Sequence, residues 1–182
     1  ARHQRSYGGN NLILTYLRKI LNEPENLEDL CYATQVLQAE SIKYRVEHYR
    51  RNRGRCMGTL YWQLNDIWPV TSWASIDYYG RFKALQYEAK RFYSPILLSC
   101  EEVGNFESRG YDYEEVSVRL CVTNDTLYPV KGTVKCAFKD SFGNVRKSWK
   151  ESVYVEKLSK KWLDKSIIDN LDVKTEHIHY IF

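Results

Sequence analysis

Several features that would assign this chain to a particular class of protein are missing from its sequence. No stretch approaches the roughly 20 consecutive apolar residues of a membrane-spanning helix, and no signal peptide is recognisable. No CxxC pair or cysteine–histidine cluster indicates zinc, and no motif indicates a cofactor. We therefore expect a protein that uses neither a metal nor a cofactor and does not bind a membrane.

Cysteine is sparse, and its spacing gives no disulfide pattern. The five cysteines are odd in number and lie in apolar surroundings: Cys31, Cys56, Cys100, Cys121 and Cys136. Such residues are typical of buried free thiols in a reducing compartment. Together with the missing signal peptide, they favour a cytoplasmic location, in a parent protein of bacterial type.

Excess charge of either sign is also missing. The chain has 27 basic and 23 acidic residues and a net charge of +4, which gives no reason to expect a nucleic-acid partner. Its longest basic run, residues 49–55, is interpreted as the solvated C-terminal end of a helix, where cations complement the helix dipole.

The two ends of the sequence are unusual. Position 1 is alanine, the only methionine is Met57, and the last residues are the apolar Tyr180-Ile181-Phe182. Both ends look cut through structure, so we expect a fragment of a longer protein.

The clearest element in the sequence is a helix that follows Asn26 and ends near Gly54. Asn26 suits the N-cap, acidic residues occupy the first turn, and apolar residues recur at helical spacing. Gln38 lies inside the apolar stripe. Because a buried glutamine must be hydrogen-bonded, we expect it to bond a neighbouring loop or strand rather than a ligand.

A buried strand is predicted at residues 56–64, which are continuously apolar or neutral rather than alternating. That pattern is typical of a strand covered on both faces, as in parallel sheets. Shorter helical patterns span residues 11–21 and about 81–93. An eight-fold α/β barrel takes about 250 residues, so residues 1–95 can form at most its last portion.

After Pro95 the apolar period changes from that of a helix to that of a strand. Buried positions then alternate with polar ones: Val116, Val118, Leu120, Val122, Val134, Cys136, Phe138, Val153 and Val155. Turn residues separate these runs, as in an antiparallel sandwich. The predicted fold class is α/β followed by all-β, with a boundary near residues 94–96.

A tryptophan-rich loop follows the predicted strand. Three of the five tryptophans, Trp62, Trp68 and Trp73, lie close to Asn65 and Asp66. Aromatic faces beside a few aimed polar groups are suited to sugar rings, and barrel enzymes place their chemistry at the C-terminal ends of strands. Stacking on a sugar is favoured for Trp62 over a place in the barrel core. Trp68 and Trp73 could equally pin the loop, and Asp66 more often braces one.

Five segments together resemble the β-mannosidases of glycoside hydrolase family 2. They are His3-Gln4, residues 32–40, residues 47–51, the motif Tyr61-Trp62-Gln63-Leu64-Asn65-Asp66 within residues 58–69, and residues 72–85. The likeness is dense from about residue 1 to 98 and thin afterwards. It implies that residues 1–95 are the C-terminal portion of a glycosidase TIM (β/α)8 barrel, and that residues 96–182 begin an immunoglobulin-like β-sandwich.

The same resemblance implies a retaining exo-glycosidase that acts on terminal β-D-mannose. Residues 56–64 would be the eighth barrel strand, and Trp62 would line the sugar subsite beside the cleaved bond. Retention needs two carboxylates about 5–5.5 Å apart. The family's nucleophile and acid/base glutamates lie in motifs absent from this chain, so both are expected upstream of Ala1, and the chain alone is expected to be inactive.

The resemblance also defines the expected ligands and partners. The substrate-binding candidates are Trp62, Asn65, Asp66, Trp68 and Trp73. Their substrate would be a β-mannoside or manno-oligosaccharide, and the chain would pack against upstream domains of the same parent.

Three alternatives remain open. A non-catalytic carbohydrate-binding sandwich is motivated by 15 tyrosines and by Trp149 and Trp162. A β-galactosidase-like or β-glucuronidase-like specificity would belong to the same family. A scaffold without a ligand is disfavoured by the crowded tryptophan loop.

Overall fold

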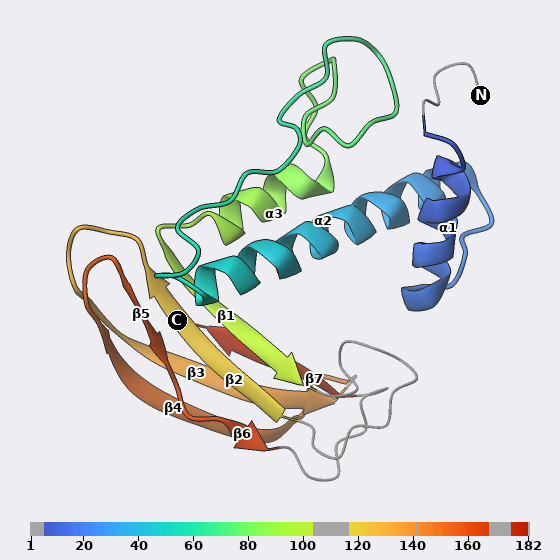
Figure 1. Cartoon of the computed structure of the whole chain (residues 1–182). Coiled ribbons are helices and arrows are strands. Elements are labelled where there is room, and N and C mark those ends of the chain that lie inside the picture. The colour runs from blue at the N-terminus through green and yellow to red at the C-terminus, as the bar shows by residue number, and fades with distance from the viewer. Residues whose placement is uncertain (1–5, 104–116, 141, 168–175, 182) are drawn as a thin grey trace. The chain divides into compact units, whose positions relative to one another are not determined.

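The computed structural model of this chain describes residues 6–103, 117–140, 142–167 and 176–181 (Figure 1). Residues of the His3-Gln4 segment lie outside this description. Two compact units divide the chain. The first comprises Ala1–Tyr49 and Gly58–Tyr93, and the second comprises Arg50–Met57 and Ser94–Phe182. Each unit is considered by itself.

The first unit is built on helices α1 (Gly9–Ile20), α2 (Leu27–Arg51, whose last residues belong to the second unit) and α3 (Ala84–Phe92). Asn26 caps α2 as predicted, because its side-chain oxygen accepts the backbone N–H of Asp29 at 2.9 Å. None of the described helices combines the length and apolar character needed to cross a bilayer.

The core of the first unit lies between α2 and α3. Ala39 and Val46 of α2 are buried against Leu85, Ala89 and Phe92 of α3. Leu85 and Phe92 are fully buried, and the alanines on both helices leave room for them. The packing of these two helices forms the platform on which the tryptophan loop is held.

The strand predicted at residues 56–64 is not formed. Apart from one isolated bridge at Asn65, no described segment pairs with this stretch as a strand, and it follows an irregular path. Its side chains at Met57, Leu60 and Leu64 are exposed. A strand requires hydrogen-bonding neighbours on its edges. The described residues of the first unit supply none, so the apolar run has no sheet to enter and no barrel strand is seen.

The second unit contains two antiparallel sheets. One is formed by β1 (Ile96–Val103), β2 (Ser117–Asn124), β5 (Ser159–Trp162) and β6 (Ser166–Ile167). The other has the order β4-β3-β7 and is formed by β3 (Val130–Asp140), β4 (Val145–Val155) and β7 (Glu176–Ile181). The prediction of a sandwich-like β region is confirmed.

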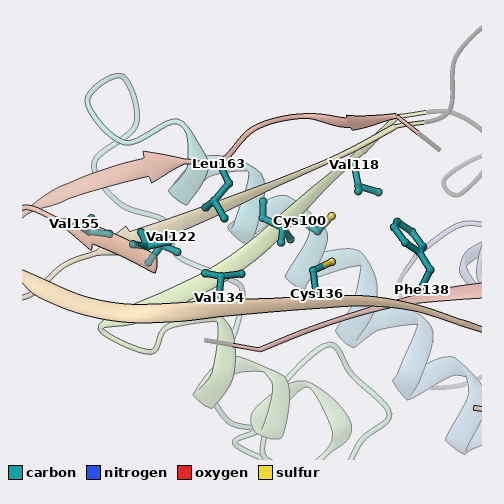
Figure 2. Packing of buried hydrophobic residues seen from close by; sticks show 10 residues of the cluster. Cys100, Val118, Val122, Val134, Cys136, Phe138, Val155 and Leu163 are labelled. Carbon is teal, nitrogen blue, oxygen red and sulfur yellow. The ribbon is translucent and has the colours of Figure 1, made fainter. Parts of the chain in front are cut away.

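The core of the second unit lies between its two sheets (Figure 2). The predicted core positions of β2, β3 and β4 are all buried: Val118, Leu120, Val122, Val134, Cys136, Phe138, Val153 and Val155. Val116, predicted on the same face, lies outside the described residues. The predicted alternation fails on β2, where Ser117, Cys121 and Thr123 are buried as well. The two-residue period nevertheless identified the core positions of each strand correctly.

The basic run at residues 49–55 is not the solvated helix end that its charge suggested. The Arg50 guanidinium contacts an Asp125 carboxylate oxygen at 2.9 Å and the Ser94 carbonyl at 2.7 Å. Arg53 also pairs with Asp125, and Arg51 is buried. A planar guanidinium can bond two oxygens at once. The Asp125 carboxylate, which follows β2, therefore compensates Arg50 and Arg53 for the loss of hydration.

The cysteines were all expected to be buried, and Cys31 is instead exposed. Three others are buried: Cys100, Cys121 and Cys136. Desolvation raises the pKa of Cys100 far above its usual range, that of Cys121 to about 11 and that of Cys136 to about 12. These thiols therefore stay protonated at neutral pH and are poor nucleophiles.

We expect Ellman's reagent at mildly alkaline pH to label Cys31 rapidly and the three buried thiols only after unfolding. Because the folded pKa of each thiol lies above the unfolded value of 9.0, its contribution to stability is complete below pH 9. That contribution is lost as the pH rises to about 11 for Cys121 and to about 12 for Cys136. Cys31→Ser, assayed by peptide mapping, is the control that should abolish the rapid phase. Rapid labelling of Cys121 in the native chain would contradict this assignment.

Candidate tryptophan-loop site

The two ends of the tryptophan loop are fastened to each other by backbone hydrogen bonds. The N–H of Asp66 donates to the Ile76 carbonyl at 3.1 Å, and the N–H of Ile76 donates to the Leu64 carbonyl at 2.8 Å. On the other side of this segment, the N–H of Lys83 donates to the Ser75 carbonyl at 2.9 Å. Residues 75–77 are thus held between the start of the loop and the approach to α3.

The buried Asp66 side chain connects the start of the loop with residues later in the chain. It is 6% exposed, and one carboxylate oxygen accepts the Ser72 hydroxyl at 2.5 Å. The other oxygen lies 3.5 Å from Nζ of Lys83, which also donates to the Ser72 carbonyl at 3.2 Å. We call Asp66, Ser72 and Lys83 the carboxylate brace. The brace connects Asp66 with residues six and seventeen positions later in the chain. The sequence did not identify Lys83 as part of this site.

A second polar cluster supports the loop from beneath. The fully buried Ser75 hydroxyl lies 2.9 Å from the Tyr61 hydroxyl and 2.8 Å from Oε1 of Gln86. The Tyr61 ring stacks on Tyr93 at 6.3 Å, and the Tyr93 hydroxyl donates to the Thr59 carbonyl at 3.1 Å. These contacts attach the chain before Trp62 to α3. These contacts could not be predicted from the sequence, because a serine and a glutamine 11 residues apart form no recognisable motif.

Two glutamines of α2 hold the far end of the loop. Gln38 donates from Nε2 to the Trp73 carbonyl at 2.7 Å, which confirms the prediction that it bonds a neighbouring loop. Gln35, one turn earlier, accepts the Ala84 N–H at 3.2 Å and so satisfies a free donor at the start of α3. The helix therefore sets the position of both the loop and the element after it.

A helix beginning near residue 81 could be capped by Asp77, but Asp77 does not cap α3. Its carboxylate accepts the backbone N–H groups of Tyr79 and Arg81, each at 2.9 Å, and the Arg81 side chain at 2.6 Å. Desolvation works to raise the pKa of Asp77, but the hydrogen bonds from Arg81 outweigh it and lower the pKa. Residues 81–83 are tied to the neighbouring segment, so α3 begins only at Ala84.

The three indoles of the loop are turned toward solvent. Trp62 is 72% exposed, Trp68 62% and Trp73 60%, and Asn65 is exposed as well. The Trp62–Gln63 peptide bond is cis. No stacked or edge contact joins these three rings to one another in the described part of the chain. The structure therefore brings Asp66 to its brace and leaves the tryptophans open.

This arrangement can bind a flat ligand but offers no free acid or base among the described loop residues. Asp66 is engaged by Ser72 and Lys83, and Asp77 is engaged by Arg81. No group of three candidate metal ligands occurs in the described ranges. The loop thus supplies aromatic surface on a rigid polar support.

Parts of this sequence are similar to those of known proteins. Residues 116–181 match the model of the Mannosidase Ig/CBM-like domain. β-Mannosidase A of Aspergillus terreus is 41% identical over 121 residues, which are 65% of this chain and 12% of that protein. β-Mannosidase of Rattus norvegicus is 42% identical over 119 residues, which are 57% of this chain and 14% of that protein.

Solved structures show the same relationship. The β-D-mannosidase of Dictyoglomus thermophilum superposes with a TM-score of 0.85 and 26% identity, over 98% of this chain and 21% of that one. An exo-chitosanase of Amycolatopsis orientalis shares the fold, with a TM-score of 0.72 and 20% identity over 99% of this chain and 23% of that one. By sequence and by fold, the chain resembles the β-mannosidases of glycoside hydrolase family 2, and it spans 12 to 14% of the length of the curated relatives described here.

Proposed function

We propose that the parent protein is a retaining exo-glycosidase that removes terminal β-D-mannose, and that this chain forms one wall of its sugar site. One observation carries the proposal: three exposed indoles lie in a loop held by a buried carboxylate brace, in a chain that is 41% identical to a β-mannosidase over 121 residues. Exposed tryptophans on a rigid support are suited to the apolar faces of sugar rings.

The residues of the loop divide the work in this proposal. Trp62 stacks on the terminal sugar, while Trp68, Trp73 and Asn65 line the same side of the subsite. Asp66 acts mainly on the loop, because both of its carboxylate oxygens already have protein partners. Keeping these side chains in position before the sugar arrives lowers the entropy that binding would otherwise lose.

The carboxylates that break the bond are proposed to come from other segments of the parent. A retaining mechanism needs a nucleophile and an acid/base about 5–5.5 Å apart, and the loop has no such free pair. The exposed apolar residues Leu60, Leu64 and Ile67 are proposed to be covered by upstream parts of the same chain. Such a cover would remove these apolar side chains from water.

We expect Trp62→Ala in the full-length parent to lower kcat/KM on an aryl β-mannoside about 10- to 100-fold, because a stacking surface is removed at the reacting sugar. The measurement is steady-state kinetics with a thermal melt beside it. Tyr128→Ala removes an equally exposed aromatic ring from the second unit and should leave kcat/KM unchanged. Full activity of Trp62→Ala would remove Trp62 from the subsite.

The function itself is tested on the unmodified parent with a panel of aryl β-glycosides. Preference for the β-mannoside supports the proposal. Preference for a β-galactoside or β-glucuronide would transfer the protein to another specificity of the family, and inactivity on all of them would reject a hydrolase.

A carbohydrate-binding sandwich is the second candidate, favoured by the CBM-like description of the family that matches residues 116–181. Its two motivating tryptophans are largely engaged. Trp149 is partly buried against the core, 5.7 Å from Phe138, and the Trp162 ring is covered by the Arg119 guanidinium at 4.8 Å. Calorimetric titration of the full chain with neutral mannan tests this candidate, and an absence of heat would remove it.

A further inference from the structure

The outward face of strands β3 and β4 carries lysines in a regular arrangement. On β3 the outward positions include Lys131, Lys135 and Lys139, four residues apart, and on β4 Lys150 pairs with Lys135. We call these four residues the lysine face. Three of them, Lys131, Lys135 and Lys150, are exposed, and Lys139 is half-buried.

The lysine face has a repeating geometry. At about 3.4 Å per residue, successive lysines of β3 lie about 14 Å apart along the strand. The cross-strand pairs between them are small, namely Thr133 with Ser152 and Ala137 with Ser148. Cationic rows therefore alternate with low rows that carry hydroxyl groups. Tyr154 lies opposite Lys131, whose Nζ is 5.7 Å from the centre of its ring.

The electrostatics of this face are unfavourable in the isolated chain. Lys135 and Lys150 are directly opposite each other, and like charges at opposed positions of an antiparallel pair destabilise the sheet. No described acid forms an ion pair with any of the four lysines. Elsewhere lysines have such partners, as Lys43 has Glu40 and Lys83 has Asp66. The lysine face therefore presents uncompensated positive charge to an external anion.

We propose that the lysine face binds a linear anionic polysaccharide. Lysine is depleted from protein–protein interfaces, and the exposed Tyr154 ring beside Lys131 is suited to stacking on a sugar. The rows of small hydroxyl side chains leave space between the charges in which sugar hydroxyls can be hydrogen-bonded. This binding is independent of the β-mannosidase proposal, because the lysine face and the tryptophan loop belong to different units.

Polygalacturonate is the probe, titrated into the full chain at low salt and followed by fluorescence anisotropy of the labelled polymer. Lys135→Gln/Lys150→Gln should raise the apparent Kd about tenfold, since each lysine near an anionic surface contributes measurably to binding. Raising the ionic strength should weaken binding of the unmodified chain. Lys90→Gln/Lys157→Gln, which removes two exposed lysines elsewhere, should change the Kd little.

Two further measurements separate binding from folding. Lys135→Arg/Lys150→Arg keeps both charges and should bind like the unmodified chain. The glutamine double variant should melt about 1 to 3 °C higher at low salt, because it relieves the opposed pair. An unchanged Kd in that variant would overturn the proposal, as would equal weakening in the Lys90/Lys157 control. Equal or tighter binding of neutral galactomannan, duplex DNA or anionic lipid vesicles would overturn it as well.

Discussion

Replacing Phe92 with alanine is expected to lower the free energy of unfolding of the first unit by about 3 to 5 kcal/mol. Phe92 is fully buried at the end of α3, where it packs with Val46 of α2 and with Leu85. Truncation to alanine removes most of this side chain from the described core cluster that joins α2 and α3. The neighbouring helices cannot close the cavity without moving the loop that α3 supports.

The measurement is urea unfolding followed by far-UV circular dichroism, with hydrogen exchange used to locate the loss. The described helices lie mainly in the first unit and the described strands in the second, so the helical signal reports mainly on the first unit. The two units need not unfold together, and a biphasic curve should therefore be fitted as two transitions. Lys90→Ala, an exposed change on the same helix, should stay within about 0.5 kcal/mol. A loss below about 1 kcal/mol for Phe92→Ala would contradict the packing.

Local patterns in the sequence were sufficient to predict the elements whose partners lie nearby or repeat regularly. The Asn26 cap was predictable because its partner is three residues away, and the alternation around Cys136 was predictable because β3 buries one face. Gln38 was placed correctly by a simpler argument, namely that a half-buried amide must find an oxygen.

The wrong predictions share one physical cause. A local sequence pattern indicates that a segment needs partners, but it does not identify the distant residues that supply them. Residues 56–64 have the composition of a doubly covered strand, but no described strand pairs with them. The arginines of residues 49–55 looked solvated because Asp125, their partner, is more than 70 positions away. For the same reason Lys83 could not be connected with Asp66 before the loop geometry was known.

Removal of the Asp66 carboxylate is expected to destabilise the tryptophan loop by about 3 to 5 kcal/mol. In Asp66→Ala the Lys83 ammonium, whose side chain is 16% exposed, would retain only uncharged partners on Ser72. A largely buried cation without a counter-charge is strongly unfavourable, and the Ser72 hydroxyl would also lose its acceptor. We expect rapid hydrogen exchange across residues 66–76, well below the urea concentration that unfolds the helices.

A double-mutant cycle separates the ion pair from the rest of the carboxylate brace. Lys83→Met alone should be damaging because it leaves the Asp66 charge buried, and Asp66→Asn combined with Lys83→Met should recover part of the loss, since two neutral groups need no counter-charge. Asp77→Ala removes a carboxylate whose partner, Arg81, is 74% exposed, so it should destabilise the loop much less than Asp66→Ala and serves as the matched control. If the two changes at Asp66 and Lys83 were simply additive, the brace would not be held by their charges. The exposed tryptophans would then owe their positions to Ser75 and the α2 glutamines, whose substitution should accelerate hydrogen exchange in the loop instead.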